Sequence, residues 1–214
     1  MGNHTRILGI TGGVGSGKSE ILKYLEEKYH MEVIKADEVA HDLIEIGGEC
    51  YDAICALFGD GILKSDRSID RAKMAKVMFD SDSLRKEVNS IIHPAVKRTI
   101  LKMIEEASDR KVPYVLIEAA LMVEEDYAAI CDEIWYIYAS VKTRTQRLKE
   151  TRNYSDEKIR QIMDAQMSEE VYTDYCDVKI DNDGNFDQTR KQIDRILGDR
   201  RKKRIGELSE NHRS

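Results

Sequence analysis

The residues from Gly9 to Glu20, GITGGVGSGKSE, have the types and the spacing of a phosphate-binding P-loop. The pattern is Gly12-x-x-x-x-Gly17-Lys18-Ser19, in which glycines let consecutive backbone N–H groups point at one anion. The lysine of such a loop bridges the β- and γ-phosphates of a nucleoside triphosphate, and the serine hydroxyl binds Mg²⁺. The pattern therefore predicts a nucleoside triphosphate and Mg²⁺ as ligands of this loop. A glycine-rich turn without a ligand is the alternative.

The residues expected to surround the nucleotide form one continuous run. They are Gly13, Val14, Gly15, Ser16, Gly17, Lys18, Ser19 and Glu20, with Ser19 as the metal ligand and Lys18 also catalytic. A P-loop alone does not say which reaction follows. The chain has no Asn-Lys-x-Asp motif, which GTPases need for guanine, and 214 residues are few for a large mechanical ATPase. A small-molecule kinase fits this length.

One carboxylate, Asp37, follows the second apolar run of the sequence, MEVI. Ligands of open α/β sheets bind at the carboxyl ends of the strands, so Asp37 is expected at that edge. A carboxylate there can accept the proton of an alcohol acceptor, whereas a phosphate acceptor needs no such base. The alternative is that Asp37 only caps the helix DEVAHDLI.

Three arginines, Arg144, Arg147 and Arg152, lie close together after the fourth apolar run. Arg144 and Arg147 are three residues apart and therefore share a helix face. An arginine fork spreads its charge over the oxygens of a transferring phosphoryl group. We expect Arg147 and Arg152 to have this catalytic role. The alternative is a solvated basic helix.

Short apolar runs separated by helical patterns must position these groups. The runs are nearly continuous rather than alternating, which is typical of parallel strands buried on both faces. Strands are expected at residues 6–11, 31–34, 114–117, 134–139 and 177–180. Helices are expected at residues 18–29, 94–107 and 155–167, with Ser155 as the cap of the last of these. This alternation predicts a doubly wound α/β fold.

The stretch from residue 38 to about 110 contains helical patterns and loops but no convincing strand. It is longer than a simple crossover between two strands, so it is expected to be a helical insertion that binds the acceptor. One of its helices is expected to open at Pro94, because proline is allowed in a first helical turn. Helix packing without a ligand is the alternative.

Several motifs of the chain resemble the dephospho-coenzyme A kinase family. In the family's order, between about residues 6 and 197, they are LGITGGVGSGKS, VIKADEVAH, VNSIIHPAV, EAALMVE, QRLKETR, IMDAQM and DVKIDNDG. The resemblance implies ATP-dependent phosphorylation of the 3′-hydroxyl of dephospho-CoA, which gives CoA and ADP in the last step of CoA synthesis. It also implies a P-loop kinase-like α/β fold, in which helices flank a parallel five-stranded sheet, with a helical substrate-binding insertion and a lid.

The resemblance implies roles for single residues as well. Asp37 becomes the general base, and Arg147 and Arg152 belong to a lid that closes on the ATP phosphates. The residues implied to bind the acceptor are Asp37, His93, Leu121 and Glu124. Those implied to hold the adenine ring of ATP are Asn182 and Gly184. A structural histidine and a simple Asn-Asp-Gly turn are the alternatives for His93 and for the adenine-binding pair.

The expected domains follow from the same resemblance. Residues 1–37 and 111–204 form the nucleotide-binding core, which includes the lid at about residues 144–170. Residues 38–110 form the helical acceptor-binding region, and residues 205–214 are a C-terminal tail.

Composition and charge exclude other classes of protein. The net charge is −6, so no basic field favours nucleic acid as a partner. No apolar run is long enough to span a membrane, and the N-terminus lacks the apolar region of a signal peptide. The four cysteines form no C-x-x-C pair and are expected to be reduced thiols. We therefore expect a cytoplasmic protein without membrane partners; its oligomeric state stays open, with a monomer slightly favoured.

Two other functions stay open from the sequence. One is another P-loop small-molecule kinase, such as a nucleoside or nucleotide kinase, and the other is a nucleotide-binding regulator without catalysis. Asp37 and the arginine cluster favour a catalyst over a regulator. The products formed from ATP and a panel of acceptors distinguish these functions.

Overall fold

A computed structural model describes residues 5–210 of the chain, with side chains for residues 5–200. Its five strands form one sheet in the order β2-β3-β1-β4-β5. The strands are β1 (Arg6–Thr11), β2 (Glu32–Lys35), β3 (Tyr114–Glu118), β4 (Glu133–Tyr138) and β5 (Val178–Asp181). Strand β2 pairs with β3, β1 with β4, and β4 with β5, and each of these pairs is parallel. The predicted parallel sheet of five strands is confirmed.

Burial on both faces explains why the apolar runs are continuous in these strands. In β3, Val115, Leu116 and Ile117 are successive residues and all are 0% exposed. In β4, Ile134 and Trp135 are 2% and 0% exposed. Successive side chains of a strand point to opposite faces, so burial of neighbours means that both faces are covered.

The chain folds into two compact units. Of the described residues, the first unit contains 5–7 and 31–127, and the second contains 8–30 and 128–210. Strands β2 and β3 therefore share a unit with the predicted acceptor-binding region, whereas the expected core grouped them with the P-loop. The functional division into core, acceptor-binding region and lid stays a prediction. None of the helices within residues 5–210 is both long and apolar enough to cross a membrane.

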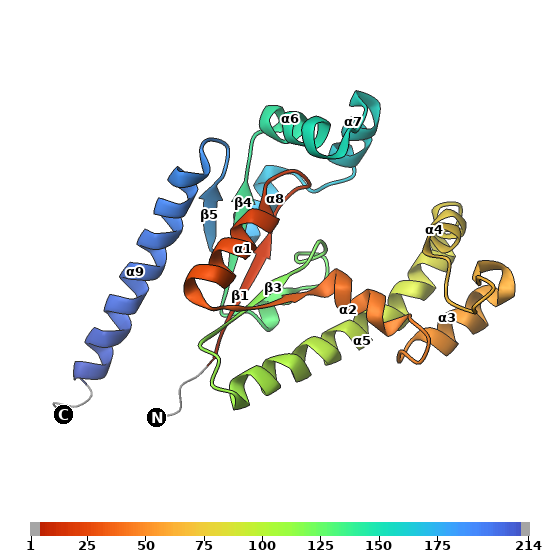
Figure 1. The fold of residues 1–214 in the computed structure, drawn as a ribbon, viewed down its shortest axis with the longest axis horizontal. Helices are drawn as coiled ribbons and strands as arrows, with labels where there is room; N and C mark the ends of the chain where they lie inside the picture. Colours follow the sequence, from red (N-terminus) through yellow and green to blue (C-terminus); the bar gives the residue numbers. More distant parts are fainter. Residues whose placement is uncertain (1–4, 211–214) are drawn as a thin grey trace. The chain divides into compact units, whose positions relative to one another are not determined.

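Helices make up most of the first unit. They are α2 (Ala36–Leu43), α3 (Tyr51–Phe58), the short 3₁₀ helix η1 (Gly59–Ile62), α4 (Arg71–Phe79) and α5 (Asp82–Asp109). Helices α2, α3 and α4 all pack on α5 (Figure 1). Between residues 38 and 110 the only strand-like pairing is an isolated bridge between Leu63 and Ile69. The expectation of a helical stretch without a strand is confirmed.

Helix α5 begins twelve residues before the predicted start at Pro94. Ser81 caps it, because its Oγ accepts a hydrogen bond from the Leu84 N–H at 3.2 Å. The prediction of a helix that opens at Pro94 is therefore wrong. An internal proline lacks the N–H that would bond to the carbonyl four residues earlier, here that of Ser90. Pro94 and Ser90 are both exposed, so the position of the missing hydrogen bond lies on the solvent side of α5.

The second unit adds helices to β1, β4 and β5. They are α1 (Lys18–Tyr29), α6 (Val141–Arg152), α7 (Asp156–Asp164), α8 (Glu169–Tyr175) and α9 (Phe186–Glu210), and the 3₁₀ turn η2 (Tyr127–Ala129) precedes β4. Helix α1 has the predicted bounds, and Ser155 caps α7 as expected, with its Oγ accepting from the Lys158 N–H at 3.3 Å. Residues 205–210 of the predicted tail continue α9, and residues 211–214 lie outside the described residues.

Asp194 of α9 ties this last helix to α1. The hydroxyls of Tyr24 and Tyr29 both donate to its Oδ1 at 2.6 Å, and Lys28 Nζ donates to its Oδ2 at 2.8 Å. Partial burial acts to raise the pKa of Asp194, but the three donors outweigh it and hold that pKa below its ordinary value. The cluster fixes the position of the helix whose first residue is the P-loop lysine.

Candidate active site

The P-loop forms the turn between β1 and α1. The Ser16 N–H donates to the Gly13 carbonyl at 3.1 Å, which closes the loop on itself. Lys18 is the first residue of α1, and its Nζ donates to the Gly12 carbonyl at 2.7 Å. The lysine side chain thus lies back over the loop, at a helix N-terminus of the kind that binds anions.

Three glycines of this loop adopt backbone conformations that other residues rarely adopt. The φ angle is +147° at Gly12, +83° at Gly15 and +92° at Gly17. A Cβ at Gly12 would lie 2.4 Å from the Ile137 carbonyl oxygen, and one at Gly17 would lie 2.3 Å from Asn182 Nδ2. Both the dihedral angle and the lack of space therefore require glycine at Gly12 and Gly17.

The hydroxyl groups of the loop suit a triphosphate and its metal ion. Ser16 is 1% exposed, and among the described residues its buried Oγ has no hydrogen-bond partner. A buried hydroxyl of this kind can bind a phosphate oxygen. Ser19 and Glu20 are exposed in the first turn of α1, where the Ser19 hydroxyl can reach a cation and the Glu20 carboxylate favours the helix dipole.

Arg144 of α6 contacts the P-loop directly. Its Nε donates to the Val14 carbonyl at 2.9 Å, and its Nη2 donates to the side chain of Gln166. The guanidinium lies so close to Gly13 that a Cβ there would come within 2.4 Å of Nη2. Burial lowers the pKa of Arg144 from its ordinary value. The sequence did not predict this contact of Arg144 with the P-loop, although the helix face that Arg144 shares with Arg147 was a usable signal.

Arg147 contacts the same loop from the next turn of α6. Its Nη1 donates to the Ser16 carbonyl at 3.2 Å, and its Nη2 donates to the Asn182 carbonyl at 2.7 Å. Arg152, in the last turn of α6, is exposed, and its guanidinium lies 6.0 Å from the centre of the Tyr154 ring. Within residues 5–200 Arg152 forms no hydrogen bond with the P-loop. The structure therefore brings Arg147 to the loop, while the role of Arg152 stays a prediction.

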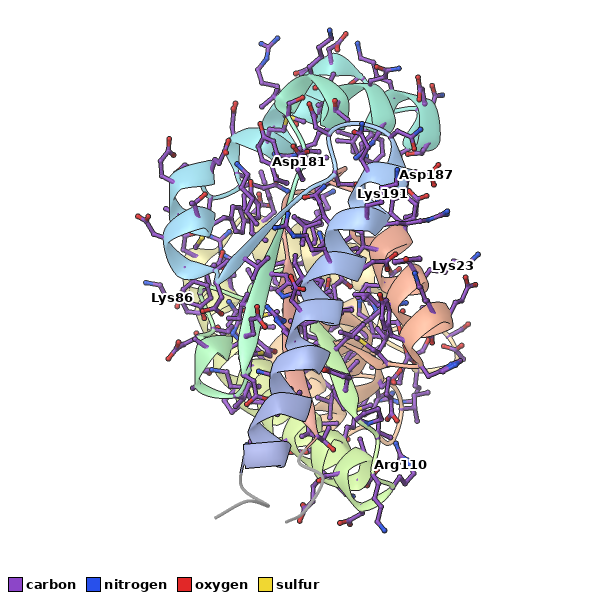
Figure 2. The ribbon with its side chains drawn as sticks, turned by 90° about the vertical axis from the view of Figure 1, so that its left-hand side faces the viewer. Lys23, Lys86, Arg110, Asp181, Asp187 and Lys191 are labelled. Carbon is purple, nitrogen blue, oxygen red and sulfur yellow. The ribbon has the colours of Figure 1, made fainter. Side chains whose placement is uncertain are left out.

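Asn182, at the end of β5, supports the loop together with Thr189 of α9. Asn182 is 1% exposed, and its Nδ2 donates to the Ser16 carbonyl at 2.7 Å. Thr189 is also 1% exposed, and its Oγ1 donates to Asn182 Oδ1 at 2.9 Å. Figure 2 shows the two ends of the turn between β5 and α9, with Asp181 on β5 and Asp187 at the start of α9. The Asn182 side chain thus holds the P-loop backbone, and its predicted contact with adenine stays a prediction.

Gly184 lies in the turn that follows Asn182. The neighbouring Asp183 accepts a hydrogen bond from the Ser140 N–H at 2.7 Å, which joins this turn to the start of α6. Hydrogen bonds from Ser140 and Thr143 hold the pKa of Asp183 below its ordinary value. These hydrogen bonds explain how the turn is held at the start of α6. The predicted adenine contact of Gly184 stays a prediction.

Asp37 lies in the first turn of α2 and lines a cavity of about 180 Å³ in the first unit. The residue that caps α2 is Lys35, so the alternative in which Asp37 is merely the cap is wrong. Apolar side chains from α2, α4 and α5 form much of the cavity wall, among them Ala40, Met74, Met78, Val88, Ile92 and Val96. The exposed Asp37 carboxylate therefore borders an apolar cavity in the predicted acceptor-binding part of the chain.

His93 and Leu121 line the same cavity as Asp37. His93 Nδ1 lies 2.5 Å from Glu125 Oε1, and Lys97 Nζ lies 3.9 Å from Glu125 Oε2. Glu124, which the motif implicated, is exposed and is not among the residues that line this cavity. Sequence reasoning missed Glu125, because no periodic pattern in this turn distinguishes two successive glutamates. The role of Glu124 stays a prediction.

Comparison with known proteins identifies the family. A family model described as dephospho-CoA kinase matches residues 6–188. The dephospho-CoA kinase of Oceanobacillus iheyensis is 33% identical over 193 residues, which are 90% of this chain and 96% of that protein. The crystal structure of TT1252 from Thermus thermophilus has a TM-score of 0.78 at 25% identity, and the match covers 92% of this chain and 98% of the TT1252 chain.

A second solved structure supports the fold alone. The dephospho-CoA kinase from Campylobacter jejuni has a TM-score of 0.68 at 20% identity, and the match covers 92% of this chain and 96% of the Campylobacter jejuni chain. The family match and the relative from Oceanobacillus iheyensis both extend over most of the chain. The chain therefore belongs to the dephospho-CoA kinase family.

Proposed function

We propose that this chain transfers the γ-phosphoryl group of ATP to the 3′-hydroxyl of dephospho-CoA, which gives CoA and ADP in the final step of CoA biosynthesis. The observation that carries the proposal is the position of Asp37, a carboxylate that borders a largely apolar cavity. An alcohol acceptor needs a base for its proton, and a carboxylate is a common one. Membership of the dephospho-CoA kinase family supports this acceptor.

In this proposal Asp37 acts on the acceptor hydroxyl. The 3′-oxygen forms a bond to the γ-phosphorus while the bond to the oxygen that bridges the β- and γ-phosphates breaks. ADP leaves, and Asp37 receives the hydroxyl proton. Phosphoryl transfer has a loose transition state, so positioning and charge neutralisation supply most of the rate enhancement. His93, Leu121 and Glu124 are proposed to hold the acceptor beside Asp37.

ATP is assigned to the P-loop, and Mg²⁺ to Ser19. The buried, unpaired Oγ of Ser16 and the glycine backbone support this assignment. When bound, Mg²⁺ would supply charge neutralisation on the β- and γ-phosphate oxygens. Lys18 is proposed to add a positive charge there, and Arg147 and Arg152 to do the same from a lid at about residues 144–170. The residues proposed to hold the adenine ring are Asn182 and Gly184.

The remaining assignments concern the rest of the chain. We assign acceptor binding to residues 38–110 and nucleotide binding to residues 1–37 and 111–204. The reaction is proposed to take place in the cytoplasm, with a monomer favoured and without nucleic-acid or membrane partners. The net charge of −6 supports the absence of a nucleic-acid partner.

A panel of acceptors tests the proposal. Purified protein is incubated with Mg²⁺-ATP and dephospho-CoA, AMP or a nucleoside, and the products are separated and weighed by mass spectrometry. The expected result is one added phosphoryl group on dephospho-CoA and equimolar ADP. Phosphorylation of AMP with none of dephospho-CoA would instead identify a nucleotide kinase. Binding of ATP without ADP production from any acceptor would favour a regulator.

A further inference from the structure

Arg144 is a half-buried cation without an anionic partner in the described part of the chain. Its Nε donates to the Val14 carbonyl at 2.9 Å and its Nη2 donates to the side-chain oxygen of Gln166. Within residues 5–200 it forms no ion pair with a carboxylate. Charged groups that leave water are normally paired, because an unpaired buried charge is costly. The positive charge of Arg144 is therefore not balanced by the described residues around it.

The surroundings of Arg144 keep this charge in place. Apart from burial, the pKa of Arg144 is influenced by two tyrosine hydroxyls, those of Tyr136 and Tyr172. Both tyrosines are buried, and their rings stack with centroids 4.9 Å apart. Burial raises the pKa of Tyr136 to about 12, so its hydroxyl is neutral at pH 7. Because an arginine stays protonated in proteins, a full positive charge remains available to a bound anion.

The guanidinium of Arg144 lies against Gly13 of the P-loop. Gly13 differs from Gly12, Gly15 and Gly17, because its φ angle lies outside the left-handed region. A Cβ at Gly13, however, would lie 2.4 Å from Nη2 and 2.8 Å from Nη1 of Arg144. Glycine at this position therefore makes room for the guanidinium. Since the N–H groups of the same loop form the expected anion site, the unbalanced charge lies where phosphates are expected to bind.

Gln166 holds the guanidinium without cancelling its charge. It is half-buried between α7 and α8, where its own N–H donates to the Met163 carbonyl at 3.1 Å. Its amide oxygen accepts from Arg144 but carries no net charge. A glutamate at this position would bind the arginine more strongly, and it would also neutralise the arginine. An amide therefore suits a site that fixes the orientation of the guanidinium and keeps its charge for a ligand.

We propose that Arg144 is a further cation of the nucleotide site, whose charge is balanced by the phosphate chain of ATP, and that Gln166 is the residue that positions it. The charge acts on the phosphates across the backbone of Gly13, which has no side chain to separate them. Gln166 thereby links the segment between α7 and α8, within the expected lid, to the P-loop. The inference rests on the proposed function, because it takes ATP as the ligand of this loop.

Replacement of the neutral partner of Arg144 by a charged one tests this inference. Gln166→Glu changes one amide to a carboxylate of nearly the same shape. The matched control is Gln161→Glu, the same change at an exposed position of α7 whose side chain forms no hydrogen bond within residues 5–200. Calorimetric titration with Mg²⁺ present measures the Kd of ATP and of inorganic tripolyphosphate for both variants and the wild type. Urea unfolding measures the stability of the same proteins.

The expected result separates the effect of charge from an effect on folding. In Gln166→Glu the Kd of both ligands should rise about tenfold, because the new carboxylate cancels the charge of Arg144 and repels the phosphates. The stability of this variant should equal or exceed that of the wild type, since the carboxylate pairs with a guanidinium that lacks an anionic partner. Gln161→Glu should bind both ligands within about twofold of the wild type. Wild-type affinity in Gln166→Glu, an equal loss in the control, or a lower stability of Gln166→Glu would overturn the inference.

A second pair of variants tests the position of the guanidinium. Gly13→Ala places a methyl group where Arg144 Nη2 lies, so it should displace the guanidinium and raise the Kd of tripolyphosphate about fivefold. Arg144→Gln should itself raise this Kd about tenfold. In the Arg144→Gln background the shorter side chain leaves room, so Gly13→Ala should change the Kd less than about twofold. An equal effect of Gly13→Ala in both backgrounds would also overturn the inference.

Turnover distinguishes this inference from the proposed function. In Gln166→Glu the KM of ATP should rise with the Kd, while the KM of dephospho-CoA stays at the wild-type value. Weaker binding of ATP and tripolyphosphate in that variant supports the inference even if the wild type phosphorylates a different acceptor. Phosphorylation of dephospho-CoA with an unchanged KM of ATP supports the function and rejects the inference. A wild type that binds neither ATP nor tripolyphosphate overturns both.

Discussion

The replacement Asn182→Ala tests whether this side chain supports the P-loop or contacts adenine. It removes the 2.7 Å hydrogen bond to the Ser16 carbonyl. That carbonyl keeps a donor in Arg147 Nη1 at 3.2 Å, and Thr189 Oγ1 keeps an acceptor in the Asp181 carbonyl at 3.0 Å. Because neither partner is left unpaired, the loss is that of one net hydrogen bond, about 1 kcal/mol, from the ordered loop. In the variant the bound phosphates must supply this ordering themselves, which raises their Kd about fivefold.

The assay compares two ligands that both have three linked phosphates, of which only one, ATP, also carries adenosine. If Asn182 acts by holding the loop, ATP and inorganic tripolyphosphate should both bind about fivefold more weakly to Asn182→Ala. If Asn182 contacts adenine, ATP binding should weaken while tripolyphosphate binding stays at the wild-type value. Calorimetric titration with Mg²⁺ present measures both affinities under the same conditions.

Thr189 provides an independent perturbation of the same support. Thr189→Val removes the hydroxyl that orients Asn182 Oδ1. Like Asn182→Ala, it should therefore lower the affinity for both ATP and tripolyphosphate. Thr189→Ser keeps the hydroxyl and should bind both ligands like the wild type, which makes it the matched control. Equal affinities of the Val and Ser variants for tripolyphosphate would refute the reasoning. Urea unfolding of each variant checks that the native state is populated.

Three further predictions follow from other parts of the chain. Asp37→Asn should lower kcat at least about 100-fold with little change in ATP affinity, and Lys18→Ala should abolish turnover; wild-type kcat in Asp37→Asn would exclude the base role. The pKa of Asp194 is lower in the folded protein than in the unfolded chain, where it is about 3.9, so ionised Asp194 stabilises the folded protein above that pH. This stabilisation is lost as the pH falls through the pKa of the folded state. Asp194→Asn should therefore be less stable than the wild type in urea at pH 7, by about 1–2 kcal/mol, and the difference should shrink at pH 3; a constant difference would contradict this. Burial raises the pKa of the Cys131 and Cys176 thiols to about 12, so a disulfide reagent at pH 8 should label them slowly in the native protein and fast in urea; fast native labelling would disprove this.

The sequence predicted the sheet well because its signals are local. The expected strand at residues 6–11 and helix at residues 18–29 have the observed bounds, since a buried apolar run and an amphipathic stripe need no distant partner to be recognised. The start of α5 was missed because a local rule placed it at Pro94. Contacts of α5 with α2 and α4 favour a helix that continues through the proline, and Ser81 was the available start signal.

The candidate site was predictable to the extent that its residues lie in motifs. Asp37 and His93 were expected near one another from their motifs, and both line the same cavity. Which of two successive glutamates faces His93 depends on the path of the turn after β3, and sequence alone does not contain that information. The supporting role of Thr189 was equally inaccessible, because its partner Asn182 was assigned to the ligand.

The contacts of the P-loop explain why its supporting residues escape a motif. The glycine pattern specifies the side of the loop that presents N–H groups to an anion, but the carbonyl groups of the same loop also require donors. These are Lys18 for Gly12, Arg144 for Val14, and Arg147 and Asn182 for Ser16. All but Lys18 are more than a hundred residues away in the chain, so their spacing from the loop is set by the fold and not by a local pattern. Arginines and an asparagine near a P-loop are therefore ambiguous in sequence, because a carbonyl and a phosphate oxygen attract the same donors.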